Sequence, residues 1–169
     1  MAKRHASLVP LSHDHHHGLA LALRLRQGTN ALLNDGWTHD RREQAKRVLD
    51  FYHTELRPHF AAEEEVVFPM MKEHMPGSQG KIETLVDQHR QIEDIIARIR
   101  IAQDDALNET LVSLGVLLEQ HIRIEERELF PLYESGISEE LADETGQRVS
   151  LVLDRYRLTD IQHKGQSLP

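Results

Sequence analysis

The chain has 169 residues, a net charge of −8 and no cysteine. This length fits one domain with at most a tail, and it is sufficient to bury a hydrophobic core. The acidic balance argues against a nucleic-acid partner, because a phosphate backbone requires a basic face. The absence of cysteine excludes disulfides and cysteine-ligated zinc or iron–sulfur sites. With no apolar run near 18 residues and no signal-peptide pattern, we expect a cytoplasmic protein without a membrane span.

The first predicted helix carries a histidine cluster. Residues 1–11 read as an irregular lead-in, and the helix opens near Ser12, a good N-cap, and runs to about Asn34. At about 100° per residue, His15 lies within the apolar arc of this helix and His16 lies at its border. We therefore predict that His15 faces inward, with His16 as the alternative.

The second predicted helix follows a turn at residues 34–36 and runs over about residues 38–73. Pro58 lies inside it and should remove a backbone hydrogen bond and kink the helix. His59 and Glu63 stand one turn apart in the middle of a continuous apolar stripe. A lone buried histidine is more often a core residue, but this one has a carboxylate beside it.

Glu63 is the most informative residue of this helix. The helical wheel places it on the apolar stripe, whereas Glu64 and Glu65 point away. A buried carboxylate with no basic residue on its stripe is costly unless something cationic binds it.

The third and fourth predicted helices span about residues 79–102 and 106–134. His89 is central to an isoleucine-rich stripe on the third helix, and alone it could be only a core histidine. On the fourth helix, His121 and Glu125 again face the apolar side.

The fourth helix repeats the second. Residues 59–69 and 121–131 both read His-x-x-x-Glu-Glu-x-x-aliphatic-Phe-Pro, at a constant offset of 62 residues. In each copy the first glutamate faces inward, and Glu126 points away as Glu64 does. A purely structural helix pair would not need two such histidine–carboxylate pairs.

The fold class follows from these segments. Short connections favour antiparallel neighbours, so we predict an all-α fold, an up-down-up-down four-helix bundle over about residues 11–134. An additional C-terminal helix is expected over about 138–158, and the tail from Gly165 to Pro169 should be disordered. Residues 1–169 would form a single domain, with 135–169 as the C-terminal helix and tail.

Inward side chains from the four helices would meet at one depth and could bind metal. Imidazoles suit Zn, Cu and Fe, and carboxylates add oxygen donors that can bridge two ions. A single structural zinc would use four ligands and leave two buried groups unexplained, so a binuclear non-haem iron centre fits better. The predicted ligands are His15, His59, Glu63, His89, His121 and Glu125.

The order of these motifs resembles the hemerythrin-like (HHE cation-binding) family over about residues 11–134. The resemblance rests on Asp14-His15, the two His-x-x-x-Glu copies with their Phe-Pro, and His89 between them. It implies a four-helix bundle with an oxo- or hydroxo-bridged centre of two Fe ions that binds dioxygen. It also implies that the four histidines are terminal ligands and that both inward glutamates bridge the ions.

Two departures from the oxygen-carrying members stand out. Their third helix supplies histidines at i and i+4, whereas Leu85 stands four residues before His89. Their fourth-helix carboxylate is an aspartate five residues after its histidine, whereas Glu125 stands at four. The extra open position favours oxidation, peroxide chemistry, nitric-oxide binding or sensing over reversible carriage. One hypothesis is that Glu128 or Glu93 supplies the missing ligand, directly or through water.

Other interpretations remain open from the sequence. A ferritin-like oxidase would use Glu-x-x-His pairs, which is the opposite order. A sensor module would act through a partner, with 138–169 as the docking segment. Iron–sulfur repair is known for relatives that carry a cysteine-bearing segment, which this chain lacks. An unmetallated bundle would leave two buried carboxylates unpaired. Enzymatic activity, and whether the chain is a monomer or a homodimer, stay open.

Overall fold

A computed structural model describes residues 4–27 and 37–165, and within these ranges all regular structure is helical. The predicted all-α class is therefore confirmed. The elements are η1 (Ala6–Leu8), α1 (Val9–Gln27), α2 (Arg41–Phe51), η3 (Tyr52–Leu56), α3 (Arg57–Ala62), η4 (Glu63–Val67), α4 (Phe68–His74), η5 (Pro76–Ser78), α5 (Gln79–Ile101), α6 (Asp104–Ile124), η6 (Glu125–Leu129), α7 (Phe130–Gly136) and α8 (Glu139–Gly165). The predicted end of the first helix, the turn at 34–36 and the tail after Gly165 lie outside the described residues.

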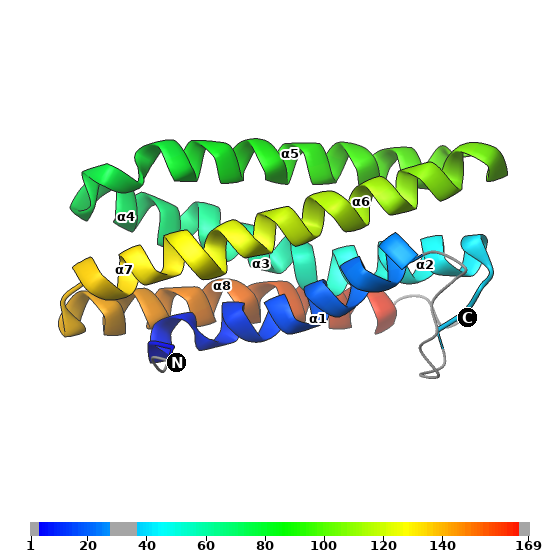
Figure 1. Cartoon of the computed structure of the whole chain (residues 1–169). Helices are drawn as coiled ribbons and strands as arrows, with labels where there is room; N and C mark the ends of the chain where they lie inside the picture. Colours follow the sequence, from blue (N-terminus) through cyan, green and yellow to red (C-terminus); the bar gives the residue numbers. More distant parts are fainter. Residues whose placement is uncertain (1–3, 28–36, 166–169) are drawn as a thin grey trace.

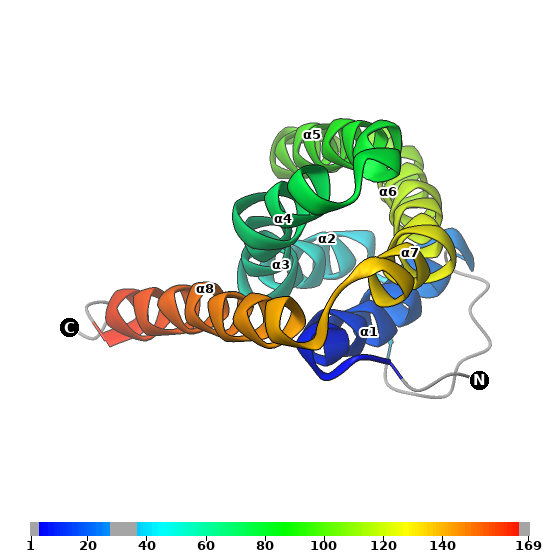
Figure 2. The same ribbon diagram turned by 90° about the vertical axis from the view of Figure 1, so that its left-hand side faces the viewer.

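In Figure 1, α1, the run α2–α4, α5 and the run α6–α7 lie alongside one another as long helical rods, and each runs opposite to the one before it. α6 packs against α1, α5 and α2, and α2 also contacts α5. α8 lies outside this group against η1, α3 and η4, and Figure 2 shows it projecting away from the rods. α8 ends at Gly165, later than predicted. No helix in the described part of the chain could cross a membrane.

The described part of the segment before the first predicted helix is helical from Ala6 onward, which corrects the expectation of an irregular lead-in over these residues. The His5 side chain accepts a hydrogen bond from the Ser7 backbone and caps η1, and α1 begins at Val9 rather than near Ser12. The His5 backbone N–H also donates to Glu134 Oε1 at 2.8 Å. This segment is therefore held against the end of the fourth rod.

Three π-helical segments, η3, η4 and η6, interrupt the second and fourth rods. The α-helix that follows each of these segments has a proline as its second residue. These prolines are Pro58 in α3, Pro69 in α4 and Pro131 in α7. In an α-helix a proline ring clashes with the carbonyl four residues earlier, and the wider π turn relaxes this clash. Pro58 therefore lies in the first turn of α3, and the rod continues to His74.

Two apolar clusters form the core. One gathers side chains near α4, α7 and α8, including Met71, Ile82 and Tyr133. The other gathers side chains toward the opposite end of the rods, including Leu25 and Leu111. Along each rod, the predicted ligands fall between residues of the first cluster and residues of the second, so a polar layer separates two apolar layers.

Gly115 lets α6 approach α1 closely. A Cβ added there would lie 2.8 Å from the Ala22 carbonyl oxygen and 3.0 Å from Leu25 Cβ. We expect Gly115→Ala to lower the free energy of unfolding by about 1–3 kcal/mol, because the backbone must shift. The matched control is Gly80→Ala on α5, where the added Cβ meets open space and the change should be neutral or stabilising by at most about 1 kcal/mol. Urea denaturation of both variants measures the difference, and equal effects would contradict it.

Candidate metal centre

The six predicted ligands meet between the rods, and the side chains of all six are buried. They come from six elements: His15 from α1, His59 from α3, Glu63 from η4, His89 from α5, His121 from α6 and Glu125 from η6. His16, the alternative to His15, is exposed and contacts the Ser12 carbonyl. His15 is therefore the inward histidine of the first helix, as predicted.

The six side chains form two groups that share both carboxylates. His15 and His59 make one group with Glu63 and Glu125, and His89 and His121 make the other with the same two glutamates. Within each group the candidate ligand atoms lie within 4.8 Å of one another. Each carboxylate thus belongs to two potential metal positions.

The contacts of the carboxylates show this sharing directly. Glu63 Oε1 lies 3.2 Å from His59 Nε2, and Glu63 Oε2 lies 3.3 Å from His89 Nε2. Glu125 Oε2 lies 3.0 Å from His15 Nε2 and 3.3 Å from His121 Nε2. Every imidazole therefore presents its Nε2 toward a shared carboxylate.

Several of these atoms are buried without a hydrogen-bond partner among the described residues. They are both carboxylate oxygens of Glu63 and of Glu125, together with Nε2 of His89 and of His121. Most buried polar atoms in folded proteins are hydrogen-bonded, because an unsatisfied one costs free energy. Nitrogen and carboxylate donors aimed at one place fit a transition-metal ion, so this cluster could hold metal.

The outer nitrogen of each imidazole is held by an acceptor on another helix. The pairs are His15 Nδ1 with Glu126 Oε1 at 2.7 Å, His59 Nδ1 with Asp14 Oδ2 at 3.2 Å, His89 Nδ1 with Glu64 Oε1 at 2.8 Å, and His121 Nδ1 with Gln88 Oε1 at 3.1 Å. Metal-ligating histidines usually donate the second ring N–H to such an acceptor, which fixes the tautomer and the ring orientation. The arrangement leaves the Nε2 atoms of all four imidazoles directed at the shared carboxylates.

Comparison with known proteins agrees with this chemistry. A family model described as the hemerythrin HHE cation binding domain matches residues 8–133. The chain belongs to this family. No curated protein and no solved structure matches the chain. The hemerythrin-like resemblance expected for residues 11–134 is thus confirmed over a slightly wider range.

Glu64 and Glu126 were expected to point away from the hemerythrin-like site, and this expectation is wrong. Glu64 contacts Nδ1 of His89 on α5, and Glu126 contacts Nδ1 of His15 on α1. The reason lies in η4 and η6, which begin at Glu63 and Glu125. A π turn advances each residue by less than the 100° of an α-helix, so the second glutamate stays near the site. The signal was present in the sequence as the Glu-Glu pair of both copies.

The hypothesis that Glu128 or Glu93 completes the site is also wrong. The Glu128 side chain is 51% exposed and pairs with Lys81 at 2.5 Å. Glu93 pairs with Arg90 at 3.0 Å on the surface. Leu85 is fully buried in the first apolar cluster. The donors brought together are four imidazoles and two carboxylates.

The pKa values of the titratable groups in the cluster are shifted in different directions. Burial lowers the pKa of His59, but the charge of Glu63 and the hydrogen bonds to Asp14 and Glu63 together outweigh it, and the pKa stands well above its usual value. Burial and the neighbouring histidine charges hold the pKa of His121 well below its usual value. Burial and the charge of Glu63 raise the pKa of Glu125 to about 7. A bound cation would replace protons on these groups, since metal ligands must be deprotonated.

A cavity of about 10 Å³ adjoins the hemerythrin-like site on the α1 side. Three candidate ligands line it with apolar neighbours: His15, His59 and His121, with Gly18, Leu56, Phe60, Leu118 and Ile122 among the others. A Cβ added to Gly18 would lie 2.7 Å from Ile122 Cδ1. A larger residue at position 18 would therefore displace the end of the Ile122 side chain at the edge of the site.

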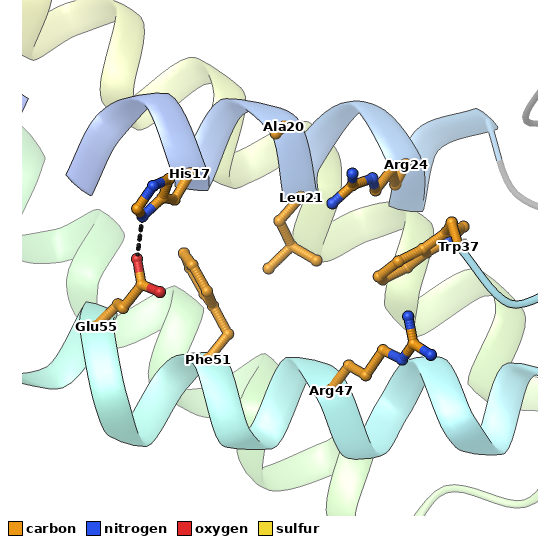
Figure 3. A pocket seen from close by; sticks show the side chains of 8 residues that line it. All are labelled: His17, Ala20, Leu21, Arg24, Trp37, Arg47, Phe51 and Glu55. Atoms are coloured by element: carbon orange, nitrogen blue, oxygen red, sulfur yellow. Dashed lines mark hydrogen bonds and ion pairs between the residues drawn. The ribbon is translucent and has the colours of Figure 1, made fainter. Parts of the chain in front are cut away.

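An outer groove of about 510 Å³ lies beside this cavity, and the two share Phe51 and Glu55. Figure 3 shows Phe51 and Leu21 directed into the groove between α1 and α2, with Glu55 at one end and Trp37 at the other. His17 Nδ1 lies 2.8 Å from Glu55 Oε2 at the end nearer the site. Phe51 and Glu55 therefore separate the solvent-exposed groove from the inner cavity.

Proposed function

We propose that this hemerythrin-like domain holds two iron ions in an oxo- or hydroxo-bridged centre in the cytoplasm. It would bind dioxygen or a related small ligand, such as nitric oxide or peroxide, for sensing, storage or detoxification. The observation that supports this most is the sharing of Glu63 and Glu125 between two pairs of buried imidazoles. An up-down-up-down four-helix bundle would be the frame that brings these donors together.

Each part of the chain has a defined role in this proposal. His15 and His59 would hold one ion, His89 and His121 the other, and the glutamates would bridge them. Bound iron supplies one-electron redox chemistry and an open coordination position for a small ligand. The aromatic rings of Phe130 and Phe68 stack on the imidazoles of α1 and α5, with ring centroids 5.3 and 5.8 Å apart, and shield them from water.

The donor set favours sensing, storage or detoxification over oxygen transport. Leu85 replaces the additional imidazole of the oxygen-carrying pattern by a buried alkyl group. The small cavity next to His15 and His59 is lined by Leu56, Phe60, Leu118 and Ile122 as well as by Asp14 and Glu55. Its apolar side would favour a neutral diatomic molecule over an anion.

Metal analysis and visible absorption of aerobically purified protein test the proposal. We expect about two irons per chain and oxo-to-iron charge-transfer bands that change when nitric oxide or peroxide is added. One zinc per chain without visible absorption would overturn it. The ferritin-like alternative predicts rapid oxidation of excess iron(II), which the same sample can be used to check.

A further inference from the structure

The two potential metal positions are related by an internal pseudo-symmetry. His15 on α1 corresponds to His89 on α5, and the second rod corresponds to the fourth through the repeated motif. The outer glutamates, Glu126 and Glu64, also correspond, because Glu126 Oε1 lies 2.7 Å from His15 Nδ1 and Glu64 Oε1 lies 2.8 Å from His89 Nδ1. Each position thus receives two imidazoles and the same two bridging carboxylates.

Each outer glutamate also forms an ion pair with an arginine. Glu126 forms an ion pair with Arg4, and Glu64 forms one with Arg90. The side chains of both glutamates are about one-quarter exposed, at 26% and 25%. These two contacts therefore add the same net charge to each position.

The described hydrogen bonds to the imidazoles differ in charge at one place. His59 Nδ1 contacts the carboxylate of Asp14 at 3.2 Å, whereas His121 Nδ1 contacts the amide oxygen of Gln88 at 3.1 Å. Asp14 and Gln88 are themselves equivalent, since each directly precedes the histidine of its helix. The positions thus differ by one negative charge at nearly the same distance.

An imidazole that binds a metal is a stronger donor when its other ring nitrogen is hydrogen-bonded to a carboxylate than when it is hydrogen-bonded to an amide oxygen. The carboxylate also adds an attractive charge close to the cation, and water screens this charge in part because the Asp14 side chain is 28% exposed. Phe60 stacks on His89 with ring centroids 3.8 Å apart, but its ring carries no charge and does not alter this balance.

We propose that Asp14 and Gln88 make the two metal positions unequal, so that a divalent cation fills the His15–His59 position before the His89–His121 position. Both are positioning residues, because each acts through the imidazole it holds. Loss of such an outer contact typically costs 10–100-fold in metal affinity, so the two binding steps should differ by roughly that factor. The inference rests on the proposed two-ion centre.

The test uses the full-length chain, freed of metal by chelation and titrated with cobalt(II) under calorimetry and visible absorption. The unmodified protein should bind two ions in two steps whose affinities differ by roughly 10–100-fold. Asp14→Asn should weaken the first step until both steps merge. Gln88→Glu should tighten the second step until both merge at higher affinity. A residue that only supported the fold would not produce tighter binding when changed.

The order of filling is checked with zinc and the imidazole resonances in NMR. At one equivalent of zinc, the resonances of His59 should shift in the unmodified protein, whereas those of His121 should shift first in the Asp14→Asn, Gln88→Glu double variant. Two equal steps in the unmodified protein, or no tightening with Gln88→Glu, would overturn this inference alone. Binding of fewer than two ions per chain would instead overturn the proposed function.

Discussion

Glu63→Gln is expected to reduce the metal content of the protein from about two ions per chain to less than one. The substitution keeps the size of the side chain but removes the charge and one oxygen donor. Since Glu63 contacts an imidazole of each group, both positions lose a ligand together. The loss of affinity should exceed the 10–100-fold that removal of an outer contact costs. Metal analysis after dialysis measures it, with far-UV circular dichroism to show that the helices persist.

Glu65→Gln is the matched control for this variant. Glu65 belongs to the same run of glutamates, but its exposed carboxylate contacts Arg155 at 2.7 Å. Its replacement should leave two ions per chain. If Glu63→Gln also retains two ions, the assignment of Glu63 as a shared ligand is wrong.

Removal of metal is expected to lower the melting temperature by about 8–16 °C. An ion present at about 1,000 times its dissociation constant stabilises the folded state by about 4 kcal/mol, and a chain of this size gains about 2–4 °C per kcal/mol. Without the ions, the carboxylate oxygens at the centre are buried without a hydrogen-bond partner among the described residues. Calorimetric scans before and after chelation, and after metal is returned, measure the shift.

The Glu63→Gln variant serves as the control for chelation, because it has little metal to lose and should melt at the same temperature in both scans. If the melting temperature of the unmodified protein does not change on chelation, the buried cluster gains no stability from a cation.

Helical periodicity was sufficient to find the buried donors. His59 and Glu63 lie on one stripe because the α-helix repeats every 3.6 residues, and the second copy, at His121 and Glu125, repeated the evidence. The same rule favoured His15 over His16, because His15 lies within the apolar arc of its helix and His16 lies at the border of that arc. These inferences needed no knowledge of how the helices are placed relative to one another.

The hydrogen bonds to the Nδ1 atoms of the histidines depend on how the helices pack, which the sequence of a single helix does not predict. Asp14 reaches His59 only because α1 lies beside α3, and the wheel of α1 alone does not contain that information. Glu128 appeared inward on an ideal α-helical wheel, but it lies in the π-helical η6, where that geometry fails. The prediction of a kink at Pro58 did not include the π turn η3 that directly precedes α3, because the local rule for proline does not anticipate one.

The crossed contacts of the outer glutamates tie together the two halves of the chain. The first half contributes α1 and the run α2–α4, the second contributes α5 and the run α6–α7, and Glu126 and Glu64 each reach across to a histidine of the other half. Neither helical hairpin therefore contains a complete metal position with its supports. Ions bound at the centre would act as non-covalent cross-links between the hairpins, and their release would loosen the whole assembly rather than one local loop.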